Sequence, residues 1–246
     1  MHYIFPVYND YKQRREEEKM AKQMSLAQKI NVLRASVMGA NDGIISVAGI
    51  VIGVAAATAD AYAILIAGLS GSLAGMISMC MGEYVSVSTQ KDSQQRAILD
   101  EQKRLANNFQ AEFDYVKQKY LAQEIDPALA QQATQELMSN DPLTTVVQER
   151  YGFNPQDFTS PYAAAIASFI AFPLGSILPM VAVTMAPPAL RIGVTMLAVL
   201  VALVLTGYLA AVLGDDPARG KAVLRNVAAG LLTMMVTFVI GQLFHA

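Results

Sequence analysis

The distribution of charged residues constrains this chain more than any other feature. Four segments contain no Asp, Glu, Lys or Arg: residues 61–82, 158–190, 192–214 and 226–244. A membrane-spanning helix needs about 20 predominantly apolar residues, and each segment can supply one. A soluble helical core would instead require several long helices that are apolar on every face. The sequence therefore predicts an all-α integral membrane protein.

We predict five spanning helices, because residues 32–57 form a further apolar run that only Arg34 and Asp42 interrupt. The other four spans are predicted at 61–81, 160–185, 192–213 and 227–244. The third contains Pro173 and Pro179, and we expect it to be kinked because proline removes a helical hydrogen bond.

A polar insert separates the second span from the third. It carries twelve carboxylates and seven Lys or Arg, too many charges for a segment that crosses lipid. Asp126-Pro127 and Asp141-Pro142 each place an N-cap acid before a proline in the first helical position. We predict helices at about 84–108, 110–123, 127–139 and 142–151.

The whole chain is thus predicted to have four regions. They are a polar tail at 1–30, two spans at 31–82, the insert at 83–157 and three spans at 158–246. Within the tail we predict a surface helix over 11–30.

Lys and Arg predict the orientation, because they are enriched in short cytoplasmic flanks of spanning helices. The chain up to Arg34 holds seven of them and the 214–226 loop holds three, whereas the loops on the opposite side hold only Arg191. We therefore expect the tail, the insert and the 214–226 loop to be cytoplasmic. The compact chain without an organelle signal favours a bacterial plasma membrane.

Asp42 is the most informative single residue. It lies about ten residues into the first span, roughly 15 Å along a helix. A carboxylate at that depth is costly and generally faces a cavity or a partner, so it indicates an ion or proton path. The alternative is an acid that pairs near the interface, with Arg34 as the candidate partner.

Small residues and methionines accompany this carboxylate. Glycines four residues apart allow close packing of membrane helices; they are Gly39 and Gly43, Gly49 and Gly53, and Gly71 and Gly75. Three methionines end the second span: Met76, Met79 and Met81. Methionine usually fills space in an apolar helix, but a thioether beside Asp42 would make a mixed soft and hard site that suits Fe(II).

The remaining chemistry is limited by what the sequence lacks. The two histidines, His2 and His245, lie at the chain ends and Cys80 lies in a span, so a metal bound by the insert would have oxygen ligands. Most acids on such an insert merely keep it solvated. No Walker loop, nucleophile elbow or metalloprotease motif is present, and no basic aromatic stripe suggests nucleic acid. We expect neither an enzyme nor a prosthetic group.

Two motifs resemble the vacuolar iron transporter family. They are RASVMGANDGIIS at 34–46 and SMCMGEYVSVSTQKD at 78–92, and SPYAAAIASF at 160–169 and GKAVLRN at 220–226 are similar to its later spans. The resemblance implies a five-span homodimer that moves Fe(II), and often Mn(II), out of the cytosol in exchange for protons. It also implies a cytoplasmic helical module after the second span that gathers metal.

The resemblance assigns roles to particular residues. Asp42 and Met79 match the transport pathway of the family, and Glu83 is a third candidate because Gly71, Asn31 and Ala35 stand where other members have pathway acids. In the insert, the matching metal-binding acids are Glu101, Glu112 and Glu149. Asp100 and Asp114 are neighbouring candidates for two missing companions, whose positions hold Arg104 and Tyr115. Thr145 and Val146 replace the methionines that accompany the last glutamate.

The leading hypothesis is a proton-coupled exporter of Fe(II), with Mn(II) as a further cargo. Its partners would be membrane lipid, divalent metal ions, protons and a second copy of the chain. The alternative is a membrane-anchored metal-binding sensor or scaffold that does not transport, which the reduced set of carboxylates favours. An iron oxidase is a weaker alternative, because histidines to complete a redox di-iron site are lacking.

Overall fold

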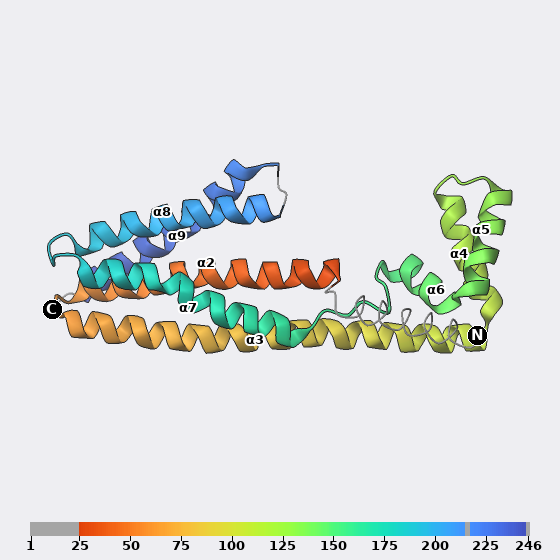
Figure 1. Cartoon of the computed structure of the whole chain (residues 1–246), viewed down its shortest axis with the longest axis horizontal. Coiled ribbons are helices and arrows are strands. Elements are labelled where there is room, and N and C mark those ends of the chain that lie inside the picture. The colour runs from red at the N-terminus through yellow and green to blue at the C-terminus, as the bar shows by residue number, and fades with distance from the viewer. Residues whose placement is uncertain (1–24, 215–216, 245–246) are drawn as a thin grey trace, which may run out of the picture. The chain divides into compact units, whose positions relative to one another are not determined.

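The computed structural model describes residues 25–214 and 217–244, and this part of the chain contains eight helices and no strand. They are α2 (Leu26–Ala57), α3 (Ala61–Asn107), α4 (Phe109–Ala122), α5 (Pro127–Asn140), α6 (Pro142–Tyr151), α7 (Pro161–Met185), α8 (Arg191–Leu213) and α9 (Arg219–Leu243) (Figure 1). Five of them, α2, α3, α7, α8 and α9, are long and apolar enough to span a membrane. The all-α class and the five predicted spans are therefore confirmed.

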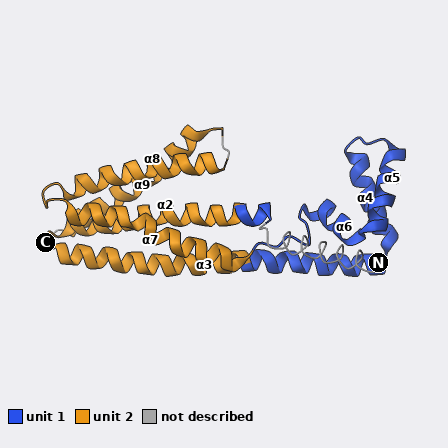
Figure 2. Cartoon of the chain, viewed as in Figure 1, with its two compact units in different colours: residues 1–29, 88–159 blue, residues 30–87, 160–246 orange. Residues whose placement is uncertain are grey.

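The described residues form two compact units (Figure 2). Unit 1 comprises residues 25–29 and 88–159, and unit 2 comprises residues 30–87 and 160–244 without 215–216. The polar insert was defined by its composition, whereas the two units are defined by contacts between residues. The predicted boundaries of the insert therefore stay a prediction. Of the predicted surface helix at 11–30, residues 11–24 lie outside the described residues.

The second span and the first helix of the insert were predicted as separate helices, but they form one continuous helix of 47 residues, α3. No proline occurs between Ala61 and Asn107, and the glycine at the change in polarity, Gly82, is helical. A single glycine in a helix costs only about 1 kcal/mol relative to alanine. The change from apolar to polar composition therefore marks a change of surroundings and not the end of a helix.

Unit 2 is held together by helices that approach closely at glycines. A Cβ atom on Gly43 of α2 would overlap the carbonyl group of Phe172 on α7, and one on Gly175 would overlap the carbonyl of Ala40. Further along α2, a Cβ on Gly241 of α9 would overlap the carbonyl of Gly53. These contacts confirm that the predicted glycine pairs on α2 serve close helix packing.

The two larger apolar clusters of unit 2 both include residues of α2. One joins α2 to α8 and α9: Ile44, Ala48, Ile52, Val199, Ala202, Leu203 and Met234. The other joins α2 to α3 and α7: Val47, Val51, Ile64, Phe172 and Val183. Large apolar side chains also point outward from the spans, for example Ile66, Leu69 and Leu73 on α3. Lipid is the solvent in which such exposure carries no penalty.

Unit 1 packs α4, α5 and α6 around a small core of Val116, Met138 and Val146. The two predicted Asp-Pro caps are confirmed. The Asp126 carboxylate accepts a hydrogen bond from the Ala128 N–H (2.9 Å), and the Asp141 carboxylate accepts one from the Thr144 N–H (3.1 Å). Hydrogen bonds from Thr144, first from its side chain and then from its backbone N–H, lower the pKa of the Asp141 carboxyl, because they favour the charged form.

Candidate functional site

Polar and sulfur-containing side chains form a stripe along α2. Arg34, Met38, Asp42 and Ser46 follow one another at intervals of four residues, which places them on one face of the helix. The Arg34 guanidinium donates to the Met38 Sδ atom (3.2 Å), and the Ser46 hydroxyl donates to the Asp42 Oδ1 atom (2.5 Å). Asp42 itself is half-buried.

A second stripe runs along α3. Ser72, Met76, Met79 and Glu83 are separated by four, three and four residues and are buried or half-buried. The Ser72 hydroxyl lies 2.7 Å from that of Ser176 on α7 and forms a hydrogen bond with it. Met76 and Met79 pack on the apolar cluster between α2, α3 and α7.

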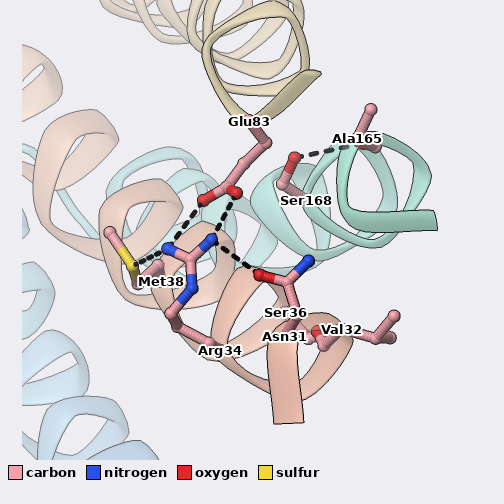
Figure 3. Close-up of polar contacts among 8 residues, drawn as sticks. All are labelled: Asn31, Val32, Arg34, Ser36, Met38, Glu83, Ala165 and Ser168. Carbon is pink, nitrogen blue, oxygen red and sulfur yellow. Dashed lines mark hydrogen bonds and ion pairs between the residues drawn. The ribbon is translucent and has the colours of Figure 1, made fainter. Parts of the chain in front are cut away.

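An ion pair joins the two stripes at one end. The Arg34 guanidinium contacts both oxygens of the Glu83 carboxylate, at 2.8 and 3.3 Å, and a third bond links it to the Asn31 Oδ1 atom (Figure 3). The Glu83 side chain is only 6% exposed, whereas that of Arg34 is 44% exposed. Arg34 thus pairs with Glu83 and not with Asp42, the partner considered from the sequence.

The two stripes also meet around Phe172 of α7. The Phe172 carbonyl contacts Gly43, the neighbour of Asp42, and its ring contacts Gly75, the neighbour of Met76. Phe172 is 1% exposed. Asp42 therefore lies at nearly the same level of unit 2 as Met76, and Met79 is less than one helical turn further along α3. At this level a carboxylate and two thioethers, hard and soft ligands, lie on neighbouring helices.

Unit 1 brings together two of the predicted metal-binding acids. Glu101 of α3 is 0% exposed and Glu112 of α4 is 7% exposed. The Arg150 guanidinium of α6 lies between them, donating to Glu101 Oε1 at 3.0 Å and to Glu112 Oε2 at a shorter distance. The two predicted acids thus share one cation from the chain itself.

Aromatic rings complete this cluster. The Tyr151 hydroxyl donates to Glu101 Oε1 (3.1 Å), and the Tyr115 ring lies 4.1 Å from the Arg150 guanidinium carbon, a cation–π contact. Burial and the bond to the Glu101 carboxylate raise the pKa of Tyr151. The Tyr115 ring therefore helps to hold the arginine in place.

The other predicted ligands lie apart from this cluster. Glu149 accepts a hydrogen bond from the Tyr120 hydroxyl (2.9 Å), and burial together with this bond raises the pKa of Tyr120 to about 12. Asp100 is exposed and 3.6 Å from Lys103, and Asp114 is exposed and bonded to Gln110. Within the described ranges, no group of three or more His, Cys, Asp or Glu is placed to hold a metal ion.

Sequence reasoning missed three elements of these sites: Met38, the Arg34–Glu83 pair and Arg150. A signal for the pair existed. Arg34 lies 23 residues before the end of α2 and Glu83 lies 22 residues after the start of α3, so an antiparallel helical hairpin brings them to the same level. Met38 also could have been found from its spacing to Asp42. No local signal indicates Arg150, because its contacts depend on how α6 packs.

Comparisons with known proteins agree with the resemblance seen in the motifs. The model of the VIT family matches residues 33–242. A "Vacuolar iron transporter homolog 5" of Oryza sativa subsp. japonica is 34% identical over 91% of this chain and 86% of its own length. A "Vacuolar iron transporter homolog 4" of Arabidopsis thaliana is 33% identical over 84% of this chain and 80% of its own.

A "Vacuolar iron transporter" of Acanthamoeba castellanii is 36% identical over 57% of this chain, and the match spans about half (51%) of that protein. These names describe transporters and not enzymes, in line with the expectation for this chain. The spans and the family match together make it an integral membrane protein. On the extent of the family match, the chain belongs to the VIT family.

Proposed function

We propose that this protein transports divalent metal ions, Fe(II) and also Mn(II), out of the cytosol in exchange for protons. The observation that carries the proposal is Asp42, a half-buried carboxylate in an apolar helix at the level of Met76 and Met79. A carboxylate in such surroundings requires a counter-charge. A proton can supply it when no metal is bound, and an arriving metal ion would displace that proton. The relatives named as iron transporters support Fe(II) as cargo.

In this proposal Asp42 and Met79 bind the metal within the membrane, and Glu83 lies at one end of the route. Glu83 is held by Arg34, so its carboxylate becomes a ligand only if this ion pair opens. The insert acids Glu101, Glu112 and Glu149, with Asp100 and Asp114 beside them, would collect metal from the cytosol. The asymmetric distribution of Lys and Arg supports an orientation with the insert on the cytoplasmic side, which we propose to be that of a bacterial plasma membrane.

We also propose that the protein is a homodimer. Arg34 and Met38 belong to the stripe on α2, yet their side chains are 44% and 46% exposed in the single chain. A guanidinium and a thioether beside an ion path would otherwise face lipid. A second copy of the chain that covers α2 would enclose this part of the stripe.

The test uses the full chain in proteoliposomes that contain a pH-sensitive dye. Asp42→Ala and Asp42→Asn should lower Fe(II) flux and the linked pH change together, by about tenfold or more, since a lost charged ligand costs about 1.5–3 kcal/mol. The matched control is Asp60→Asn, because Asp60 is exposed before α3 and caps it through the Tyr62 N–H, which asparagine also does. Wild-type flux in Asp42→Ala would rule out the proposed route.

The same assay separates transport from the alternative of a sensor or scaffold. The absence of a three-ligand metal cluster in the described part of the chain is the observation in favour of that alternative. A sensor would bind metal and leave the vesicles sealed to Fe(II), with Asp42→Ala indistinguishable from wild type.

A further inference from the structure

Two buried carboxylates in unit 1 converge on one side chain. Glu101 comes from α3, Glu112 from α4 and Arg150 from α6, so the cluster joins three helices. The Arg150 side chain is 15% exposed, and those of Glu101 and Glu112 are 0% and 9% exposed. Buried carboxylates need a cation at close range, and Arg150 occupies the position between them.

The arginine does not satisfy this cluster completely. The Glu101 Oε2 atom and the Arg150 Nε atom are buried without a hydrogen-bond partner. Arg104 adds only a distant contact to Glu101, at 3.6 Å, from a side chain that is 54% exposed. Two acids therefore share one buried guanidinium, and one carboxylate oxygen retains its full capacity to accept a ligand.

From this geometry we propose that Arg150 is a resident cation that competes with divalent metal ions for Glu101 and Glu112. While Arg150 is in place, its charge and its volume exclude a metal from the position between the two carboxylates. A neutral side chain at residue 150 would leave an oxygen-lined site with a charge of −2, suited to Mn(II) or Fe(II). The choice of Mn(II) or Fe(II) as the competing ion rests on the proposed function. The competition itself does not depend on transport.

The nature of the competing group determines what a metal ion has to displace. A guanidinium presents five N–H donors in a rigid planar fork, so one side chain can hold both carboxylates. The Tyr115 ring at 4.1 Å adds a cation–π contact, and Tyr151 occupies a lone pair of Glu101 Oε1. Metal capture at Glu101 and Glu112 thus requires Arg150 to move out of contacts that several side chains maintain.

The test measures Mn(II) binding and thermal unfolding of the detergent-purified full chain, with Asp42→Ala as background to remove the proposed site in the membrane. Arg150→Met should bind one more Mn(II) per chain than the background protein, at least about tenfold more tightly at that site, because a charge-assisted contact no longer competes. It should unfold at lower temperature in chelator and recover stability with Mn(II). Arg150→Lys keeps the charge and should bind no additional Mn(II).

A variant that lacks all three charges of the cluster separates metal binding from a general loss of structure. Arg150→Met combined with Glu101→Gln and Glu112→Gln should fold and show no response to Mn(II). If Arg150→Met folds only when Mn(II) is present, the proposal is supported. Equal Mn(II) binding with and without Arg150, or an Arg150→Met protein that stays unfolded with Mn(II) while the triple variant folds, overturns it. Neither result bears on Fe(II) flux through Asp42.

Discussion

The buried acids of the described residues, Glu83, Glu101 and Glu112, are each paired with an arginine of the same unit. Arg34 holds Glu83 in unit 2, and Arg150 holds Glu101 and Glu112 in unit 1. All three pairs connect different helices, and in each the acid is more deeply buried than the arginine. Asp42 differs, because its described hydrogen bond comes from the neutral Ser46 hydroxyl. Among the described residues of the spans, Asp42 is the half-buried carboxylate that a neutral donor holds, so it retains a need for a cation, which is the physical basis for assigning it the central role.

The Arg34–Glu83 pair gives a prediction at this scale. Arg34→Met should lower thermal stability in detergent, because it leaves the buried Glu83 carboxylate without its cation. Removing one partner of a buried pair costs about 3–5 kcal/mol, and the 44% exposure of Arg34 reduces this to about 1–2 kcal/mol. Arg34→Met with Glu83→Gln should be more stable than Arg34→Met alone. If the double variant is the less stable of the two, the loss comes from packing and not from the unpaired charge.

At the scale of elements, the neighbouring helices of unit 2 pack closely against α2 at its glycines. On one side α7 lies against Gly39 and Gly43, and on another α9 lies against Gly49 and Gly53. Asp42 adjoins the tightest of these contacts, where the Phe172 carbonyl lies against Gly43. Tight packing of backbone on backbone fixes the position of a neighbouring ligand more firmly than side-chain contacts do.

Gly43→Ala tests this packing. The added methyl group would overlap a backbone carbonyl that has no other rotamer to adopt, so we expect a loss of about 1–3 kcal/mol in stability, the usual cost of overpacking. Gly82→Ala in α3 is the matched control, since no atom lies within 4 Å of its Cβ position. Removing a helical glycine there should be neutral or stabilising by up to about 1 kcal/mol. Thermal unfolding in detergent measures the stability of both variants. Equal changes in stability for Gly43→Ala and Gly82→Ala would show that the close contact between Gly43 and α7 does not contribute to stability.

The same elements show what the sequence could and could not predict. The spans were predictable because lipid requires a long apolar run, and the starts of α5 and α6 because an Asp-Pro cap acts locally. The continuity of α3 through Gly82 was missed because a change in polarity resembles a change of element. The contacts of Arg150 arise only when α3, α4 and α6 are packed, so composition and spacing indicated the acids but not the cation between them.

At the scale of the whole molecule, α2 is the helix on which the proposed transport route and the proposed dimer both depend. Its stripe is half-buried at Asp42 and open at Arg34 and Met38. An ion path lined by one chain alone would leave these groups in contact with lipid, where a charged side chain costs several kcal/mol. Enclosure by a second copy would remove that cost and would place two equivalent stripes across a two-fold axis, the commonest symmetry of oligomers.

Cross-linking tests this arrangement in the membrane. With Cys80 replaced by alanine, Met38→Cys is the only thiol of the chain, and oxidation should produce a disulfide-linked dimer. Residues close to a two-fold axis meet their own copies, whereas Leu205 on α8, which is 56% exposed, belongs to a helix outside both stripes. Leu205→Cys in the same background should therefore remain monomeric. A Met38→Cys protein that transports Fe(II) yet forms no dimer, or forms no more than Leu205→Cys, would place the partner elsewhere and leave the stripe on α2 open to lipid.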